Sequence, residues 1–437
     1  QIDPAAKAGF LMTGSVPEPF TYYRDVRVLP AGSSLRIDES GIQEPRRYFS
    51  IAATFKEAHE RGYAKTTEDY FEKVAEALSD SVRHHMIADV TVGAFLSAGI
   101  DSTSLVGIMR DIGVEDIQTV TLGFDEFRAD ARDETPLAGK VAALYATNHQ
   151  VRNLGIDEFR EELPRVLQAM DQPSIDGINT YFVSKAAVER GLKVALSGLG
   201  GDELFAGYNT FDDVPAWVGK FGTPSRIPGA AKAFRSLYNL VGGLNPSRSP
   251  KIAGALEFGG TYTGAYYLRR GVFMPWELES VMPKEEVAEA VERLNLLDNY
   301  SGALEPDPGT AYGRVAALEA GLYMKNQLLR DSDWAGMAHS LEIRVPFVDS
   351  YLLHALAPDQ IRYALRYKKR PIVSTPRKPL PDSIRNRPKT GFFVPIQSWL
   401  EENPDMGAWR EIPPLRGKHV PWARKWAYTL TQLWEAA

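Results

Sequence analysis

The sequence has no cysteine among its 437 residues, and this absence rules out several kinds of chemistry for the chain. Disulfide bonds, thiolate metal sites and a cysteine nucleophile are all excluded. Basic residues do not dominate either, because 50 Lys and Arg stand against 56 Asp and Glu and leave a formal net charge of −6. Proteins that bind nucleic acids usually carry a basic excess, so no nucleic-acid partner is expected.

Long apolar runs are missing as well. The sequence contains no run of about 18 apolar residues, the length that a membrane-spanning helix needs. Its first residues, QIDPAAKAGF, do not have the form of a signal peptide. We therefore expect no membrane partner and a cytoplasmic location. What the sequence does have is a 44% hydrophobic share with 11% aromatic residues, which is enough for one large core or two joined cores.

Short apolar runs alternate with amphipathic segments in the first half of the sequence. Strands are predicted at 90–97, 117–124, 149–153 and 193–197, and helices at 66–87, 102–113, 133–146, 156–170 and 178–190. Strands that alternate with helices are typical of an α/β fold with a parallel, doubly wound sheet.

The remaining segments differ in character. Residues 1–50 are predicted to be rich in strands and turns, and the period beyond residue 210 is mostly helical. The helices predicted there cover 285–294, 313–330, 350–357 and 421–435. The composition of 240–262 predicts a loop, and 366–395 is either a linker or a loop that faces phosphate.

A loop of small residues, Ser97–Ser102 with the sequence SAGIDS, joins the first predicted strand to a helix. Small residues let backbone N–H groups approach an anion, and the start of a helix adds the positive end of its dipole. Asp101 would repel a bare phosphate, so its presence indicates a carboxylate that holds Mg²⁺. The alternative is an ordinary strand–turn–helix connection with Ser102 as the N-cap.

A second loop, Ser197–Glu203 with the sequence SGLGGDE, follows the strand predicted at 193–197. Its glycines allow the backbone to approach a nucleotide closely, and Asp202 and Glu203 add hard oxygen ligands. If the two strands are neighbours, Asp101 and Asp202 can share one Mg²⁺ at the carboxyl edge of the sheet. A glycine-rich turn before a helix with an acidic first turn is the alternative.

These motifs resemble a known superfamily and one family within it. SAGIDS resembles the pyrophosphate loop of the N-type ATP pyrophosphatases, usually S-G-G-x-D-S, with Ala98 at a position that is usually glycine. The second loop, followed by LFAGY, is similar to the asparagine synthetase family. Three further stretches agree with that family: GFDEF from residue 123, LLRDSDWAGMAHSLEIRVPFVD at 328–349, and LPDSIRNRPKTGFFVPIQSWL at 380–400.

The resemblance implies a fold and a division of the chain. The fold would be that of the adenine nucleotide hydrolases, with a mostly helical C-terminal part and a short β-rich N-terminal remnant. Residues 1–60 would be the remnant of a glutaminase-type N-terminal domain and a linker, and 61–437 would be the ATP-pyrophosphatase synthetase domain. The rest of the glutaminase domain is not in this sequence.

The resemblance also implies an activity: an ATP-dependent, AMP-forming carbon–nitrogen ligase that adenylates a carboxylate, releases pyrophosphate and lets ammonia attack. ATP and Mg²⁺ would be required. The catalytic residues would be Lys389, Asp101, Asp202 and Glu203, with Asp101 and Asp202 as the metal ligands. The nucleotide would be bound by Leu96, Ser97, Gly99, Asp101, Ser102, Leu122, Gly123, Ser197 and Gly198, with help from Lys369.

Three acidic residues are expected to bind the substrate, namely Glu134, Asp331 and Asp333. Asp331 and Asp333 are two positions apart on a predicted helix, so they do not share a face. One would reach the acceptor, while the other would cap the helix or pair with a neighbouring arginine. Glu342 and Arg344 are expected to form a buried structural ion pair.

One position departs from the family, because Leu199 stands where the family usually has a glutamate. That carboxylate could handle the proton of the amine or recognise the ammonium group of the substrate, and leucine can do neither. The acceptor could therefore be a carboxylate other than aspartate, or the enzyme could close an amide within one molecule. A scaffold that binds ATP without catalysis is a further alternative.

The expected partners are a small-molecule carboxylate and ammonia. The ammonia would be free in solution or would come from a glutaminase domain or subunit that this sequence does not contain. The sequence leaves open whether the protein forms a homodimer.

Overall fold

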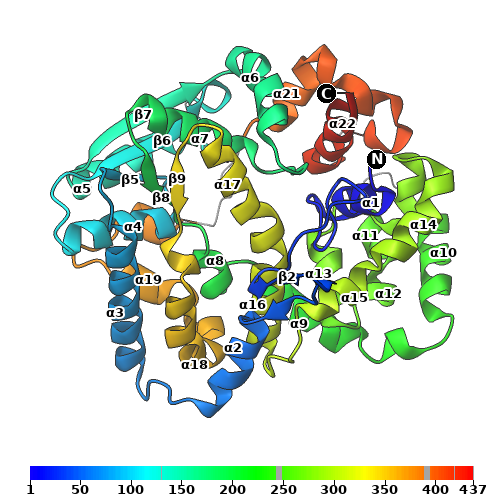
Figure 1. Cartoon of the computed structure of the whole chain (residues 1–437), viewed down its shortest axis with the longest axis horizontal. Helices are drawn as coiled ribbons and strands as arrows, with labels where there is room; N and C mark the ends of the chain where they lie inside the picture. Colours follow the sequence, from blue (N-terminus) through cyan, green and yellow to red (C-terminus); the bar gives the residue numbers. More distant parts are fainter. Residues whose placement is uncertain (129, 243–248, 388–393, 418, 437) are drawn as a thin grey trace.

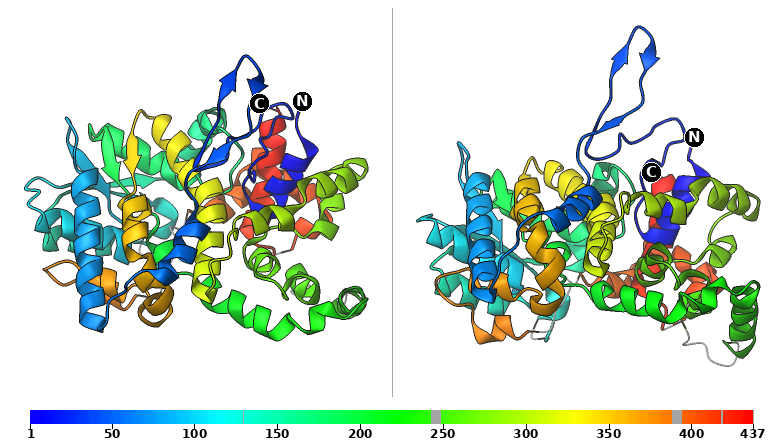
Figure 2. Two further views of the ribbon diagram at one scale, coloured as in Figure 1. Left: turned by 60° about the horizontal axis from the view of Figure 1, so that its bottom comes forward. Right: turned by 90° about the horizontal axis from the view of Figure 1, so that it is seen from below.

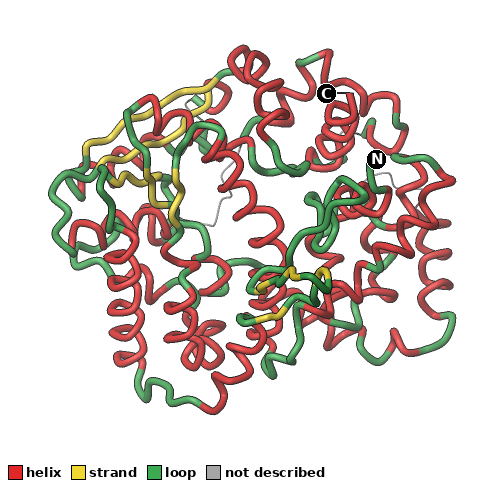
Figure 3. The backbone as a smooth tube through the Cα atoms, in the orientation of Figure 1, coloured by secondary structure: helices red, strands yellow, loops and turns green. Residues whose placement is uncertain are grey.

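The computed structural model describes residues 1–128, 130–242, 249–387, 394–417 and 419–436. Its main sheet has five parallel strands in the order β7-β6-β5-β8-β9 and lies on one side of the molecule (Figure 1 and Figure 3). The strands are β5 (Val92–Phe95), β6 (Gln118–Phe124), β7 (Asn148–Leu154), β8 (Val194–Leu196) and β9 (Glu342–Arg344). The predicted α/β class with a parallel sheet is confirmed.

Both faces of this sheet are covered by helices. On one face Val92 and Ala94 belong to a core shared with α3 (Thr67–His85), α4 (Ile100–Asp111) and α5 (Thr135–Leu144). On the other face Val120 and Ala195 pack with residues of α7 (Ile178–Glu189). Two buried faces explain why the strands read as continuous apolar runs rather than as alternating ones.

The order of the strands fixes where a ligand can bind. The chain moves outward from β5 to β6 and β7, and then returns to the other side of β5 to form β8 and β9. The direction of winding therefore reverses between β5 and β8. The loops that leave the carboxyl ends of two such strands diverge and form a crevice, which is the usual ligand site of open parallel sheets.

The remaining helices lie either beside the sheet and its covering helices or in the other half of the molecule, which is helical (Figure 1). The remaining helices are α6 (Ile156–Ala169), α8 (Gly201–Leu204), α9 (Thr210–Phe221), α10 (Ala230–Gly242), α11 (Pro250–Ala253), α12 (Ala255–Phe258), α13 (Tyr262–Arg270), α14 (Lys284–Leu294), α15 (Leu296–Gly302), α16 (Ala311–Leu318), α17 (Arg330–Met337), α18 (Ser350–Tyr367), α19 (Arg370–Ser374), α20 (Asp382–Arg385), α21 (Ile396–Glu402) and α22 (Trp422–Ala436). A π-helical segment, Glu319–Leu329, joins α16 to α17.

The N-terminal region contains a helix that the sequence did not predict. Helix α1 (Pro4–Thr13) begins at Asp3, whose carboxylate accepts a hydrogen bond from Ala5 N at 2.9 Å, and it ends at Gly14 with φ 86°. Its residues 5–12 are all buried, against α14 and α22 among others. A helix that is buried all round, as α1 is with even Lys7 covered, gives no clear 3.6-residue period, which is why the sequence pattern missed it.

Short strands after α1 agree with the expectation of strands and turns. β1 (Ser33–Ser34) pairs with β4 (Arg46–Arg47), and β2 (Ile37–Asp38) pairs with β3 (Gly41–Ile42). Figure 2 shows this hairpin projecting away from the rest of the molecule. Helix α2 (Ile51–Glu57) then leads the chain toward α3.

Three further elements differ from what the sequence pattern predicted. Helix α18 continues to Tyr367 although Pro358 lies inside it, whereas proline usually ends a helical pattern. The strand β9 has only three residues and no flanking turn signal, so it was not predicted. In the segment predicted as a loop at 240–262, α11 and α12 are single-turn helices.

Candidate active site

The two glycine-containing loops lie side by side at the reversal point of the sheet. β5 pairs with β8 so that Ala94 lies opposite Leu196. The first loop follows β5 and leads into α4, and the second follows β8 and leads into α8. Parallel neighbours end at the same edge of a sheet, so both loops emerge together.

Hydroxyl groups hold the first loop in its shape. Ser102 is buried, and its Oγ accepts a hydrogen bond from Ser97 N at 3.2 Å and donates one to Ser97 O at 3.0 Å. The Oγ atoms of Ser97 and Ser102 are 2.9 Å apart, and Ser97 Oγ also accepts from Gly99 N at 3.2 Å. The loop is therefore held in this shape by its own side chains.

Glycines in the second loop permit direct contact with the first. A Cβ atom on Gly198 would lie 2.9 Å from Ser102 N and 3.0 Å from Asp101 Cβ. Gly200 adopts φ 100°, and a Cβ there would lie 2.6 Å from Val348 Cγ2. At these two positions the approach of the loops and the left-handed backbone require glycine.

The structure brings Asp101 and Asp202 together around a single lysine. Lys369 Nζ lies 2.5 Å from Asp101 Oδ2 and also forms an ion pair with Asp202 Oδ1. Because one ammonium group contacts both carboxylates, the distance between the two contacted oxygen atoms cannot exceed the sum of the two N–O distances. Burial alone would lower the pKa of Lys369, but the charges of Asp101 and Asp202 outweigh it and raise the pKa above its ordinary value.

The backbone before Lys369 aims this side chain inward. Helix α18 ends at Lys368, which has the unusual φ of 46°, a conformation that costs energy in a residue other than glycine. Lys368 extends to the surface and pairs with Asp212 at 2.7 Å. Because the chain reverses at Lys368, the two lysines point in different directions. Lys368 lies at the surface, and Lys369 lies in the site.

A second cation lies beside the first loop. Arg387 Nη1 is 2.9 Å from Glu134 Oε1 and 3.5 Å from Ala98 O. Through this arginine, Glu134, predicted as a substrate ligand, is connected to the first loop. Lys389, predicted as the principal catalytic cation, lies outside the described residues.

The residues predicted to hold the adenine are mostly part of the core. Leu96 and Leu122 are buried, and the backbone oxygen of Leu96 accepts a hydrogen bond from Thr121 Oγ1. A Cβ atom on Gly123 would lie 2.4 Å from Asn153 Oδ1. The role of these residues in binding a base stays a prediction.

Glu203 faces away from its neighbour Asp202. It is buried, and its Oε1 accepts a hydrogen bond from the Tyr208 hydroxyl at 2.8 Å. Burial first, and then the nearby charge of Asp202, raise the pKa of Glu203 to about 7. The catalytic role of Glu203 stays a prediction.

Asp331 and Asp333 point to different environments on α17, as their spacing predicted. Asp331 is buried and accepts hydrogen bonds from Ser174 Oγ at 2.8 Å and Trp334 Nε1 at 2.9 Å. Asp333 is exposed. Burial, followed by the charge of nearby Asp176, raises the pKa of Asp331 to about 7. Their predicted contacts with a substrate stay predictions.

Replacing Asp331 with asparagine is expected to change the pH dependence of stability. The native carboxyl keeps its proton up to about pH 7, whereas in the unfolded chain it ionises near pH 4. The unchanged protein therefore loses stability as the pH rises from about 4 to about 7. The variant avoids that loss, so its advantage in the free energy of unfolding should grow by roughly 3 kcal/mol between pH 5 and pH 8. Urea unfolding at both pH values measures it.

The exposed neighbour supplies the control for that experiment. Asp333→Asn makes the same substitution on the same helix at the surface, so it separates the effect of burial from that of losing a carboxylate. An equal pH dependence in the two variants would show that Asp331 ionises in the native protein and would contradict the assignment.

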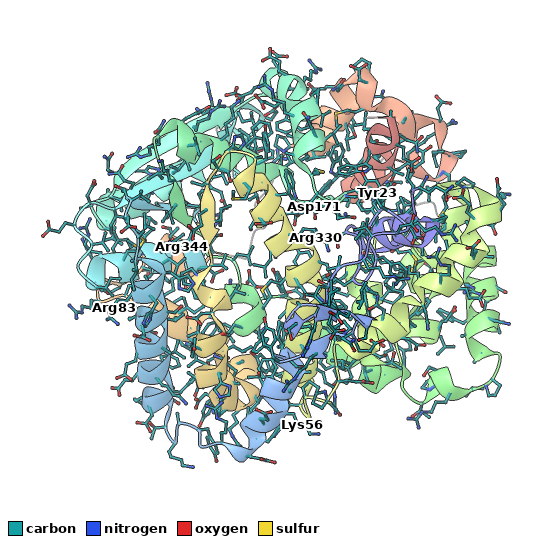
Figure 4. The ribbon with its side chains drawn as sticks, viewed as in Figure 1. Tyr23, Lys56, Arg83, Asp171, Arg330 and Arg344 are labelled. Atoms are coloured by element: carbon teal, nitrogen blue, oxygen red, sulfur yellow. The ribbon has the colours of Figure 1, made fainter. Side chains whose placement is uncertain are left out.

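The expectation of a buried pair between Glu342 and Arg344 was only half right. Arg344 Nε donates to Glu342 Oε1 at 2.8 Å, but the Glu342 side chain is 58% exposed. Arg344 lies on β9 at the edge of the sheet (Figure 4) and also donates to the backbone oxygens of His85 and Ile87, at 2.7 and 2.8 Å. The arginine ties β9 to the end of α3, and the ion pair is at the surface.

A cavity of about 1060 Å³ joins these loops to the helical half of the molecule. Its walls include Asp101, Asp202, Lys369 and Arg387, together with Asp176, Tyr208, Arg270 and Tyr323. Sequence motifs did not reveal the last four. Arg270 is bound to the buried Glu319 at 2.8 Å, and Asp176 accepts hydrogen bonds from Tyr323 and Gln327 at 3.2 and 3.3 Å.

Two further observations concern metal binding and membrane spans in the described part of the chain. No group of three or more His, Asp or Glu side chains is placed there to hold a metal ion by itself. In the same residues, none of the helices is both long and apolar enough to cross a membrane.

The fold and the paired loops define an α/β protein in which two adjoining loops meet at the reversal point of a parallel sheet. Comparison with known sequences gives the family: the asparagine synthase profile matches residues 73–411. The chain therefore belongs to the asparagine synthase family.

Individual relatives agree with the family. The chain is 29% identical over 422 residues to the glutamine-hydrolysing asparagine synthetase 1 of Bacillus subtilis, an alignment that covers 94% of this chain and 61% of the relative. It is 26% identical over 389 residues to asparagine synthetase 2 of the same organism, covering 86% and 46%. It is 23% identical over 414 residues to amidase chry2 of Gibberella zeae, covering 87% and 60%. The chain spans less than two thirds of the length of these relatives.

Proposed function

We propose that this chain is an ATP-dependent, amide-forming synthetase that transfers the AMP part of ATP to a substrate carboxylate, releases pyrophosphate and lets an amine attack the activated carbonyl. The observation that carries the proposal is the meeting of Asp101, Asp202 and Lys369 beside a loop of the phosphate-binding type. Membership of the asparagine synthase family supports it.

The first loop would bind the leaving pyrophosphate. Its backbone N–H groups lie at the beginning of α4, a helix of 12 residues, where the helix dipole favours an anion. Ser97 and Ser102 already hold the loop in place, so little order has to be created when the nucleotide binds.

The two carboxylates fit a magnesium ion that is bound together with phosphate. Mg²⁺ in nucleotide sites usually takes one or two carboxylates and completes its shell with phosphate oxygens and water. Asp101 and Asp202 would be those ligands, and the described residues contain no larger acidic cluster that could hold the ion alone. The ion would neutralise charge on the pyrophosphate.

Lys369 and Arg387 would act on the phosphates as fixed cations. Charge builds up on the phosphate oxygens as ATP breaks, and cations that are already in position stabilise it at little cost of reorganisation. Lys369 stays protonated because its pKa is raised. We also propose that Lys389, predicted from the resemblance, faces the α-phosphate.

The acceptor carboxylate would lie in the cavity next to the loops. Aspartate is one candidate, because the relatives include asparagine synthetases. A different acceptor is the second candidate. It is favoured by Leu199, which is half-buried and carries no charge where the resemblance gives a glutamate. The amine would be ammonia, free or supplied by a glutaminase.

The direct test is exchange of labelled pyrophosphate into ATP in the presence of one carboxylate at a time. The proposal expects exchange that depends on a carboxylate and on Mg²⁺, and AMP with an amide product when ammonium is added. Asparagine as the product would identify aspartate as the acceptor. If ATP binds but none of a broad panel of carboxylates supports exchange, the proposal is wrong and an ATP-binding scaffold is the better account.

A further inference from the structure

A rare type of helix separates two cavities in this protein. The π-helical segment Glu319–Leu329 runs from α16 to α17, through the middle of the molecule (Figure 1). Tyr323 and Gln327 line the active-site cavity, while Met324 and Lys325 line a second cavity of about 690 Å³. π-Helical turns are uncommon and often occur at functional sites, so this segment invites a functional explanation.

The second cavity has mostly apolar walls beside the π-helical segment. They include Phe55, Leu204, Ala316 and Phe347. Polar side chains line other parts of this cavity, among them Glu18 and Glu203. Glu18 pairs with Lys325 at 2.6 Å, and Glu203 accepts a hydrogen bond from Tyr208 at 2.8 Å, so both have partners within the protein.

Asn326 is the polar residue that the two cavities share. It lines both of them and is only 5% exposed. Among the residues that the structure describes, its Oδ1 atom is buried without a hydrogen-bond donor. Buried amide oxygens nearly always have a donor, because leaving one unpaired is costly. The position therefore calls for a ligand that brings an N–H or O–H group.

Two kinds of acceptor lie in the wall of the active-site cavity at this segment, the Asn326 amide oxygen and the Asp176 carboxylate. Tyr323 and Gln327, on the same π-helical segment, hold the carboxylate of Asp176 in the wall of the active-site cavity. An amide oxygen accepts a hydrogen bond from a neutral amine without favouring its protonation, unlike a carboxylate. The lone pair of such an amine stays available for attack on a carbonyl.

We propose that Asn326 Oδ1 binds the amine nucleophile, with ammonia as the simplest case, and orients it toward the activated carboxylate. Asn326 is thus a positioning residue for the second half of the reaction. The inference rests on the proposed function, because it needs an activated carbonyl in the same cavity.

Kinetics with ammonium chloride test this role. Asn326→Leu keeps the approximate size of the side chain but removes the acceptor, so the KM for ammonium should rise about tenfold, the loss of roughly one hydrogen bond. Pyrophosphate exchange does not involve the amine and should stay within about twofold of the unchanged protein. Asn326→Asp retains an acceptor oxygen, so the KM for ammonium should stay within about threefold of that of the unchanged protein. Its carboxylate favours the protonated amine, however, so the rate of amide formation should fall.

Met324→Leu is the matched control, because Met324 lies on the same segment and faces only the second cavity. It should leave the KM for ammonium unchanged. If Asn326→Leu lowers exchange as much as amide formation, or if Asn326→Asp raises the KM as much as leucine does, the proposed role is wrong. Lack of exchange in the unchanged protein would instead overturn the proposed function itself, and this inference with it.

Discussion

Replacing Asp202 with asparagine is expected to lower the rate of ATP–pyrophosphate exchange by about a thousandfold. Asparagine has nearly the same shape, so the loop should keep its fold, but it removes a charge that both Lys369 and the proposed magnesium ion need. Lys369 would retain Asp101 at 2.5 Å as its partner, which limits the loss of stability. The measurement is the initial rate of exchange at saturating ATP and Mg²⁺.

A neighbouring ion pair provides the control for this variant. Asp212 pairs with Lys368 at 2.7 Å, and both side chains are about half exposed. Asp212→Asn therefore removes an Asp–Lys contact one residue away from the site lysine without touching the site. Exchange should stay near that of the unchanged protein. A comparable loss in both variants would mean that the effect comes from a general change in charge or folding.

Replacing Gly207 with alanine is expected to lower exchange by about a hundredfold, although no functional atom is removed. The new Cβ would lie 1.9 Å from Asp202 Oδ1 and 2.7 Å from Lys369 Cε, so both side chains must move. A displacement of about 1 Å at a catalytic group can cost a hundredfold in rate. Exchange kinetics and thermal unfolding together separate misplacement from loss of the fold.

Gly219→Ala is the matched control, because it makes the same substitution at a position where the new Cβ atom has space. Gly219 lies inside α9, and a Cβ there would meet nothing within 4 Å. Alanine in a helix interior is worth up to about 1 kcal/mol more than glycine, so this variant should be slightly more stable and fully active. Normal exchange in Gly207→Ala would contradict the packing around Asp202 on which the site depends.

The location of the site followed from the sequence because local patterns determine it. Two short apolar runs, each followed by a glycine turn and an aspartate, predicted loops at the same edge of a parallel sheet. The structure places β5 beside β8 and brings Asp101 and Asp202 to one lysine. No knowledge of the remaining fold was needed for that step.

The position of Lys369 could not be predicted in the same way. The resemblance gave Lys369 a supporting role, and the structure shows that Lys369 contacts both aspartates. The role of Lys389, which lies outside the described residues, stays a prediction. The position of Lys369 depends on where α18 ends and on the left-handed backbone at Lys368. Pro358 predicted an earlier end for that helix than the structure shows. The backbone conformation at Lys368 has no sequence signal.

The far wall of the cavity was also beyond prediction from sequence. Asp176, Arg270 and Asn326 come from separate segments that meet only in the folded chain. None belongs to a motif with a fixed spacing, and their environment comes from tertiary packing. A π-helical segment carries Asn326, and periodicity arguments cannot distinguish such a segment from an ordinary helix.

The account depends most on the joint action of Asp101 and Asp202 on magnesium pyrophosphate. Calorimetric titration of the protein with pyrophosphate, with and without Mg²⁺, tests it without requiring the acceptor. We predict binding that is strengthened by Mg²⁺ in the unchanged protein, and loss of that strengthening in both Asp101→Asn and Asp202→Asn. If either variant binds magnesium pyrophosphate as tightly as the unchanged protein, the two carboxylates do not share the ion and the proposed site is wrong.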